Sequence, residues 1–146
     1  MHKKNSYIHI MKILVMGLPG SGKTYLSQKL HPLLDAAWYN ADRVRSMAND
    51  WDFSKEGRIR QANRMKAFAD FEKKNKRFVV CDFVCPTKET RKAFGPDILI
   101  WMDTIDKGRY EDTNKLFEAP QNVEFHVRTW NEENHKEIAE EILKNV

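Results

Sequence analysis

The sequence has few of the features that mark secreted or membrane-embedded chains. It contains two cysteines, Cys81 and Cys85, which are too few for a disulfide framework and whose spacing is not that of a zinc site. Its apolar runs fall far short of the ~20 residues that cross a bilayer, and its charged start lacks the apolar stretch of a secretory signal. We therefore expect a soluble cytoplasmic protein with reduced thiols and no membrane partner.

Long blocks of like charge are also missing. The 25 basic and 21 acidic residues give a formal charge of +4 and are spread along the chain. This mild excess favours an anionic partner, and a phosphate-bearing small molecule accounts for it as well as a nucleic acid does. Because no long basic run is present, we do not expect nucleic-acid binding.

The length of 146 residues suits one domain with one hydrophobic core. No internal repeat or low-complexity linker divides the chain. We expect a loose N-terminal extension over residues 1–10 and a single domain over residues 11–146. The longest irregular stretch of this domain is expected between Asp103 and Asn122.

Short apolar runs alternate with segments of helical periodicity. The runs predict five strands and the stripes predict helices, with Ser54 and Thr87 as N-caps and Pro32 near the end of the first helix. This alternation favours a three-layer α/β/α fold with a mainly parallel five-stranded sheet and ligands at the carboxyl ends of its strands. The expected strands are residues 12–16, 36–40, 77–83, 97–102 and 122–127. The helical stripes are Leu26, Leu30, Leu33 and Leu34, then Ile59, Ala62, Met65, Phe68 and Ala69, and finally Ile138, Ile142, Leu143 and Val146.

The segment GLPGSGKT, residues 17–24, fits the pattern G-x-x-x-x-G-K-[ST] between an expected strand and an expected helix. Its glycines let backbone N–H groups face phosphate oxygens, and the positive end of the helix adds to this cradle. Lys23 is expected to reach the β and γ phosphates and the Thr24 hydroxyl to bind Mg²⁺. The structural alternative is a glycine-rich turn. The pattern predicts a P-loop NTPase-type fold with an ATP site at Gly17, Pro19, Gly20, Ser21, Gly22, Lys23, Thr24 and Tyr25.

A second polar cluster, NADRVR, follows the second expected strand and so opens toward the same edge of the sheet. Asp42 in this cluster can orient or deprotonate an attacking hydroxyl, and Arg45 can grip an anion. The alternative is that Asp42 only occupies a helix start, near the positive end of its dipole. Asp82, at the end of the third expected strand, is either a metal-site carboxylate beside Thr24 or an acid that caps a neighbouring helix.

Six segments together point to one family. They are GLPGSGKT, NADRVR, WDFSKEGRIRQANR, DFVCPTKETR, MDT and FEAP, which run in this order from about Met11 to Pro120. Blocks of the same kind occur in the same order in the adenylylsulfate kinases, and the sequence resembles a shortened member of this family of P-loop kinases. The resemblance implies Mg²⁺-dependent transfer of the ATP γ-phosphoryl group to the ribose 3′-hydroxyl of adenosine 5′-phosphosulfate.

The resemblance also implies roles for single residues. Asp42 and Arg45 match the second aspartate and the arginine of the family segment D-G-D-x-x-R. Asp42 would position the acceptor hydroxyl, and Lys23 would complete the catalytic pair. Asn40 and Ala41 replace the first aspartate and the glycine, which removes a negative charge from the site.

On the acceptor side, Phe53 and Arg58 match the family residues that lie beside the adenine and on the phosphosulfate, and Gln61 stands where the family has asparagine. Without the family, Phe53 would be read as a core residue. Cys85 replaces a family serine, and direct phosphoryl transfer gives it no task as a nucleophile. The acceptor-site wall carried over from the family is Phe83, Val84 and Pro86.

The region that forms a lid in the family is short here. Only IDKGRYEDTNKLF separates Asp103 and Thr104 from the FEAP block. Lys107, Arg109 and Lys115 are expected lid residues that neutralise the transferring charge. The alternative is a solvated loop, and a short lid excludes water poorly.

Two other functions stay open at this point. The first is a P-loop kinase for another small hydroxyl, nucleotide or polynucleotide acceptor, which a short lid would admit more easily. The second is a non-catalytic nucleotide-binding module, which Asn40 and the short lid suggest. The leading interpretation is an ATP- and Mg²⁺-dependent adenylylsulfate kinase of sulfate assimilation, and a homodimer is one assembly open to it.

Overall fold

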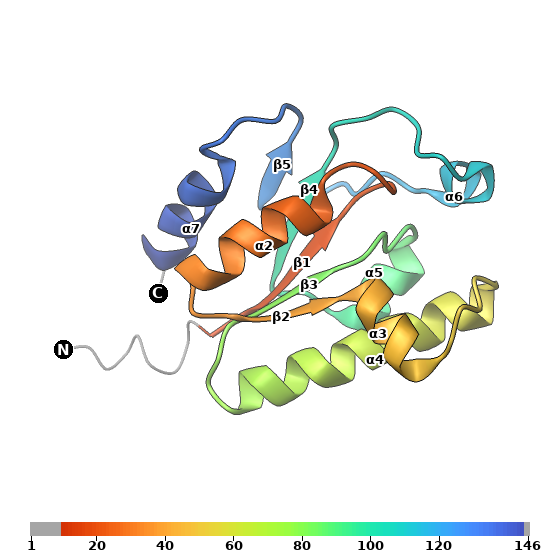
Figure 1. The fold of residues 1–146 in the computed structure, drawn as a ribbon, viewed down its shortest axis with the longest axis horizontal. Coiled ribbons are helices and arrows are strands. Elements are labelled where there is room, and N and C mark those ends of the chain that lie inside the picture. The colour runs from red at the N-terminus through yellow and green to blue at the C-terminus, as the bar shows by residue number, and fades with distance from the viewer. Residues whose placement is uncertain (1–9, 145–146) are drawn as a thin grey trace.

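The computed structural model describes residues 10–144, whose centre is a parallel sheet (Figure 1). The strands are β1 (Lys12–Met16), β2 (Ala37–Asn40), β3 (Val79–Asp82), β4 (Ile98–Met102) and β5 (Phe125–Val127). The helices are α2 (Lys23–Leu33), α3 (Ala41–Ala48), α4 (Lys55–Lys74), α5 (Lys88–Phe94), α6 (Glu111–Leu116) and α7 (Asn134–Lys144). The five strands lie in the order β2-β3-β1-β4-β5, and every pairing is parallel. The expected five-stranded sheet is confirmed.

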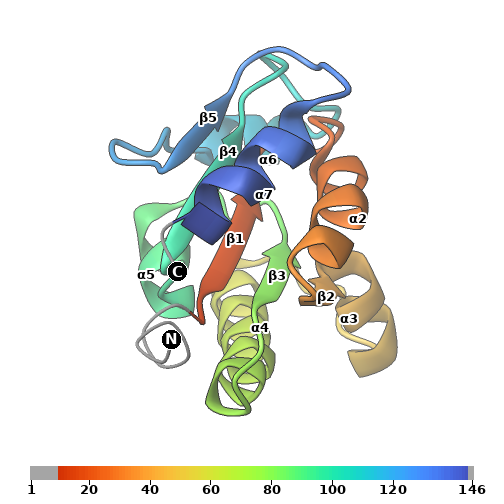
Figure 2. The same cartoon turned by 90° about the vertical axis from the view of Figure 1, so that its left-hand side faces the viewer.

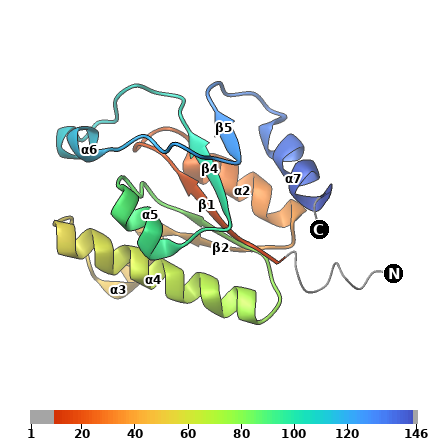
Figure 3. The same cartoon turned by 180° about the vertical axis from the view of Figure 1, so that it is seen from behind.

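Helices cover both faces of the sheet (Figures 1 and 2). The helices α2 and α7 pack on one face, and α4 and α5 lie on the other, which Figure 3 shows from behind. Side chains of β1 alternate between two core clusters because successive residues of a strand point to opposite faces. The first cluster includes Ile13, Val15, Leu26, Leu30, Ile138 and Ile142. The second includes Leu14, Met16, Met65, Ala69, Phe94 and Leu99. The three-layer α/β/α fold is therefore as predicted.

The sheet order brings the loops of several strands to one edge. The chain passes from β1 to β2 on one side of the sheet, and it later enters β4 on the other side of β1. Such a reversal leaves a crevice at the carboxyl end of the central strand, which is where open α/β sheets bind ligands. The loop that follows β1 is residues 17–22, the expected phosphate loop.

Three expectations about helices were wrong. Leu33 and Leu143 are exposed rather than buried, because each lies one position off the stripe that its helix turns inward. The stretch between Asp103 and Asn122 is not wholly irregular, since it contains α6. The sequence does not indicate α6, because this helix has no side-chain N-cap bond and no apolar stripe, its buried residue being Thr113. Val146 and residues 1–9 of the expected extension lie outside the described residues.

The strand limits also differ slightly from expectation. The third strand is Val79–Asp82 rather than residues 77–83, and the fifth is Phe125–Val127 rather than residues 122–127. Within residues 10–144, no helix is both long enough and apolar enough to cross a membrane.

Both cysteines lie in the interior. Cys81 in β3 is 0% exposed and Cys85 is 1% exposed, and neither forms a disulfide. Burial raises the pKa of both thiols, that of Cys85 to about 12, because an apolar surrounding disfavours the thiolate. A thiol of this kind is a poor nucleophile at neutral pH.

We therefore expect both thiols of the folded protein to resist Ellman's reagent at pH 8. The native chain should show almost no absorbance change over an hour, whereas denaturation in guanidinium should release two equivalents. Rapid reaction of one equivalent with the native protein would contradict the burial of that thiol.

A close approach at Gly57 in α4 gives a second prediction. A Cβ on Gly57 would lie 2.1 Å from the backbone oxygen of Asp52, so the loop before α4 has no room for it. Helix propensity alone would make Gly57→Ala stabilising by about 1 kcal/mol. We expect the opposite sign, a loss of about 1–3 kcal/mol in chemical denaturation, because the loop must shift. The control is Ala67→Gly at an exposed position of the same helix, which measures the difference in helix propensity between alanine and glycine without a clash. A more stable Gly57→Ala protein would disprove the clash.

Candidate active site

The loop after β1 has the backbone of a phosphate cradle. Gly20 and Gly22 have φ values of +90° and +101°, in the left-handed region that favours glycine. Gly22 is also the N-cap of α2 and offers no capping side chain, so the first N–H groups of this helix have no side-chain acceptor there. A Cβ at Gly22 would overlap the indole of Trp130, which packs on this turn.

Lys23 opens α2 and points back across the loop. Its Nζ donates to the carbonyl oxygen of Leu18 at 3.0 Å. Burial lowers the pKa of the Lys23 ammonium to about 8, and the nearby charge of Arg109 lowers it further, whereas Asp82 and Asp42 oppose the shift. A phosphate group at this position would favour the charged form of Lys23 and offer it a stronger partner than a carbonyl.

A buried carboxylate lies beside the loop. Asp82, 2% exposed, ends β3 and accepts hydrogen bonds from Thr24 Oγ1 at 3.1 Å and from Trp38 Nε1 at 3.0 Å. Asn40 Nδ2 donates to both carboxylate oxygens of Asp82, at 3.3 and 3.2 Å, and to Thr24 Oγ1 at 3.2 Å. Burial raises the pKa of Asp82, and these donors work against that rise by favouring the carboxylate.

The oxygens of Thr24 and Asp82 suit a magnesium ion. Mg²⁺ prefers oxygen ligands and keeps several of its waters, so a hydroxyl and one carboxylate are a sufficient protein contribution beside a triphosphate. In residues 10–144 no group of three or more His, Cys, Asp or Glu side chains could enclose a metal. Phosphate oxygens and water would therefore have to complete the coordination shell.

The sequence placed Asn40 at the site only as the replacement of a family aspartate and gave it no role of its own. Its amide joins Thr24 to Asp82, and its Oδ1 accepts from the backbone N–H of Arg43 at 3.1 Å, which caps α3. The signal in the sequence was its place at the end of an expected strand, after Trp38 and Tyr39, because ligands bind at the carboxyl ends of the strands in such sheets. Asn40 thus links the loop side of the site to the helix that carries Asp42.

One cleft of about 900 Å³ unites most of the predicted residues. The phosphate loop and the start of α2 contribute Pro19, Gly20, Gly22, Lys23, Thr24 and Tyr25 to its lining. The other predicted residues that line it are Asp42, Arg45, Phe53, Arg58, Gln61, Asp82, Phe83, Val84, Pro86 and Arg109. The cleft is also lined by residues that the sequence analysis did not name, which are Gln28, Trp51, Thr90, Tyr110, Asp112 and Thr113. It is lined as well by Asn40, Ala41 and Cys85, which the sequence analysis named only as departures from the family segments.

Four predicted site residues do not line this cleft. Gly17 packs under the loop, where a Cβ would lie 2.5 Å from the backbone oxygen of Met102. Ser21 is fully buried, and its hydroxyl has no hydrogen-bond partner. Lys107 and Lys115 are exposed outside the cleft, so of the three expected lid cations only Arg109 faces the site.

Asp42 occupies a helix start and also faces the cleft, so its position is compatible with both roles considered from the sequence. Asp42 lies in the first turn of α3, where a negative charge is favourable to the helix dipole. It also lines the cleft, and its charge acts on Lys23 across the gap. A carboxylate that is exposed to the cleft and close to a lysine can meet a hydroxyl substrate there.

Phe53 is not a core residue. Its side chain is 52% exposed at the cleft, and two guanidinium groups lie over its ring, Arg45 at 4.3 Å and Arg58 at 5.5 Å from the centroid. Trp51 lies 6.5 Å from Phe53, centroid to centroid, and is half exposed. Two open aromatic rings with two cations form a surface suited to a planar base that carries an anionic group.

Arg45 and Arg58 already have protein partners. Arg45, 4% exposed, donates from one nitrogen to the backbone oxygens of Asp50 and Asp52 at 2.8 and 3.2 Å. Arg58 donates to the oxygen of Phe53 at 2.9 Å and to Thr113 Oγ1 at 3.3 Å. Arg58, which is the more exposed of the two, is the better placed to meet a ligand, whereas Arg45 mainly holds the loop over residues 49–54.

An ion-pair cluster fixes this loop from behind. Asp50 accepts from Arg60 Nε and from Arg64, both at 2.7 Å, and Asp52 accepts from Arg60 at 3.1 Å. The two guanidinium groups hold the pKa of Asp50 well below its usual range. Gln61 belongs to the same network, since it accepts from Arg64 and donates to the backbone oxygen of Ala41.

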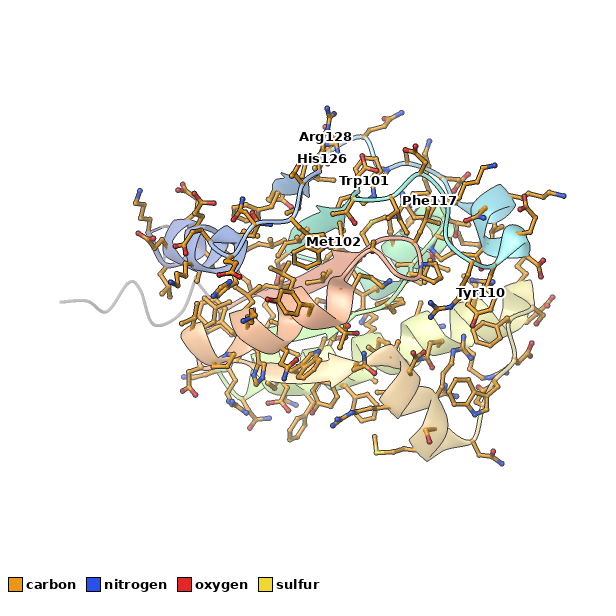
Figure 4. The ribbon with its side chains drawn as sticks, turned by 45° about the horizontal axis from the view of Figure 1, so that its top comes forward. Trp101, Met102, Tyr110, Phe117, His126 and Arg128 are labelled. Carbon is orange, nitrogen blue, oxygen red and sulfur yellow. The ribbon has the colours of Figure 1, made fainter. Side chains whose placement is uncertain are left out.

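Residues 103–118, called the lid segment below, are anchored at both ends. At its start, Asp103 Oδ2 lies 2.9 Å from His126 Nε2, and Arg128 lies close to the same nitrogen. At its end, Phe117 stacks on Trp101, which also stacks on His126 with 4.4 Å between ring centroids (Figure 4). The lid segment is therefore a docked part of the fold rather than a free solvated loop.

Comparisons with known proteins show the family and the fold of this chain. The sequence profile of the family described as adenylylsulphate kinase matches residues 9–98. A probable adenylyl-sulfate kinase of Aeropyrum pernix is 34% identical over 88 residues, which are 54% of this chain and 46% of that protein. The match thus spans about half the length of that relative.

Two solved structures share the fold. The APS kinase of Mycobacterium tuberculosis in complex with AMPPNP and APS has a TM-score of 0.73 at 17% identity, over 93% of this chain and 96% of that one. The shikimate kinase of Acinetobacter baumannii in complex with shikimate has a TM-score of 0.57 at 17% identity, over 98% and 96% of the two chains. Because the family profile covers more than half of its length, this protein belongs to the adenylylsulphate kinase family.

Proposed function

We propose that this protein is an ATP-dependent kinase that phosphorylates the ribose 3′-hydroxyl of adenosine 5′-phosphosulfate. The observation that carries the proposal is the single cleft, which has a phosphate loop at one side and Asp42, Phe53 and Arg58 at the other. Family membership supports the acceptor. The reaction would belong to cytoplasmic sulfate assimilation.

On the donor side, backbone N–H groups of residues 17–24 would hold the β and γ phosphates of ATP, together with the Lys23 ammonium. The buried carboxylate of Asp82 and the hydroxyl of Thr24 would hold Mg²⁺. When bound, the ion supplies positive charge to the phosphate oxygens. These groups would be in place before the reaction, so catalysis would come mainly from alignment and charge stabilisation.

On the acceptor side, the adenine would stack on Phe53 and Trp51, and Arg58 would meet the phosphosulfate. Asp42 would accept a hydrogen bond from the 3′-hydroxyl and take its proton as the hydroxyl oxygen bonds to the γ-phosphorus. The bond between the γ-phosphorus and the bridging oxygen breaks, and ADP leaves with that oxygen. The product is the 3′-phospho derivative of the acceptor.

The first test replaces the acceptor carboxylate. We expect Asp42→Ala and Asp42→Asn to lower kcat by about 10²–10⁴-fold, because both remove the base. The affinity for ATP should change little, since Asp42 lies on the acceptor side. Turnover is measured as formation of the 3′-phospho product by chromatography. Asp106→Asn, an exposed acid outside the cleft, is the control. Full activity of Asp42→Ala would refute the assigned role.

The second test concerns the acceptor itself. Arg58→Ala should weaken binding of adenosine 5′-phosphosulfate by about tenfold or more, because a charge-assisted contact is lost from a half-buried position. Calorimetric titration with and without AMPPNP measures this affinity. Arg43→Ala removes an arginine of α3 that does not line the cleft, and it should leave the affinity unchanged. Equal affinity of Arg58→Ala and the parent protein would show that the acceptor is wrongly assigned.

A kinase for another small hydroxyl acceptor is the second candidate. The observation in its favour is that the Arg45 guanidinium donates to the backbone oxygens of Asp50 and Asp52. Fewer cations are then left to bind a phosphosulfate. A screen of hydroxyl acceptors with ATP separates the two candidates. Turnover of another hydroxyl with none of adenosine 5′-phosphosulfate would select the alternative, and ATP binding without any turnover would select a non-catalytic module.

A further inference from the structure

The middle of the lid segment lies directly against the phosphate loop. A Cβ on Gly108 would lie 3.1 Å from both Cδ and the backbone oxygen of Pro19, so the backbone of Gly108 approaches this loop closely. Nearer the start of the segment, Thr104 Oγ1 donates to the backbone oxygen of Ser21 at 2.7 Å. The lid segment thus contacts the phosphate loop at two points.

One side chain holds Gly108 in this position. The backbone N–H of Gly108 donates to Asn114 Oδ1 at 2.8 Å, and Asn114 Nδ2 donates to the backbone oxygen of Gly108 at 2.9 Å. Both polar groups of this peptide segment are therefore satisfied by one amide. The helix that carries Asn114 is itself fixed on its other side, where Arg58 donates to Thr113 Oγ1 at 3.3 Å.

The residue that follows Gly108 is the cation of the lid segment that faces the cleft. Arg109 lines the cleft together with Gly20 and Lys23. The pKa of Lys23 is lowered mainly by burial, and the positive charge of Arg109 lowers it further. Arg109 lies over the ring of Tyr110 at 5.4 Å, which limits its freedom further.

We propose that Asn114 is a positioning residue, whose two hydrogen bonds to Gly108 hold Arg109 beside Lys23 at the phosphate end of the cleft. The proposal rests on the ATP site of the proposed function and is independent of the acceptor. An arginine that is held in place loses little further conformational freedom when a triphosphate binds. The clamp formed by Asn114 and Gly108 would thus make the short lid effective without a large closing movement.

The clamp itself is tested by amide hydrogen exchange of the full-length chain, labelled with ¹⁵N. The Gly108 N–H should be protected in the parent protein and should exchange at least tenfold faster in Asn114→Ala. Asn75→Ala is the matched control, because Asn75 also holds a backbone group, the oxygen of Phe71, at the far end of α4. Unchanged protection of Gly108 in Asn114→Ala would overturn the clamp.

The link to Arg109 is tested by a double-mutant cycle, read as affinity for AMPPNP with Mg²⁺ in calorimetry. We expect Arg109→Ala to weaken binding by about tenfold, Asn114→Ala by about fivefold, and the double variant no more than Arg109→Ala alone. A merely structural role of Asn114 would lower the melting temperature and multiply with Arg109→Ala. Multiplied effects, or an unchanged affinity of Asn114→Ala, would therefore overturn the proposal.

The two proposals fail in different ways. If the parent protein binds AMPPNP but does not phosphorylate adenosine 5′-phosphosulfate, the acceptor is wrong and the cycle still decides the role of Asn114. If the parent protein phosphorylates the acceptor and the cycle shows no coupling, Asn114 has no positioning role while the proposed function stands. A parent protein that does not bind AMPPNP would refute both.

Discussion

The carboxylate of Asp82 is the group on which the site depends. A buried charge is costly unless hydrogen bonds satisfy it, and here the donors come from β2 and α2. Satisfying Asp82 therefore fixes the Thr24 hydroxyl against the phosphate loop. Asn40, one of these donors, also caps α3 and so sets the start of the helix that carries Asp42. One buried charge thus relates the donor side of the cleft to the acceptor side.

The donor side was predictable because its chemistry is local in the sequence. A strand, a glycine-rich loop, a lysine, a hydroxyl residue and a helix occur within residues 12–33, and each has a direct counterpart in the structure. The five strands and their mainly parallel direction followed from apolar runs that alternate with helical stripes, whereas their order in the sheet was not predicted. The loop pattern predicted too many residues at the cleft, because Gly17 and Ser21 pack inside the loop and do not line the cleft.

The acceptor side was less predictable because distant contacts hold it. The loop of residues 49–54 carries Trp51 and Phe53, and its position is set by ion pairs between Asp50 and two arginines of α4. No periodicity marks such pairs, since charged residues on a helix face are usually solvated. The lid segment is similar, because Phe117 packs on Trp101 of β4 and no sequence pattern marks the bonds between Asn114 and Gly108. The family resemblance named Phe53 and Arg58, but it did not reveal what positions them.

This contrast has a consequence for specificity. The donor side is held by backbone geometry and by groups buried in the core, where a substitution costs stability. Apart from the buried Arg45, the acceptor side is held by the partly exposed Arg58, Arg60 and Arg64. Ion pairs of exposed arginines usually contribute less than about 1 kcal/mol to stability. Under the proposed function, changes at Trp51, Arg58 or the ion pairs of Asp50 would alter the acceptor side and leave the phosphate loop intact. The acceptor is therefore the property in which relatives of similar fold are free to differ, and it must be established for this protein by its own acceptor contacts.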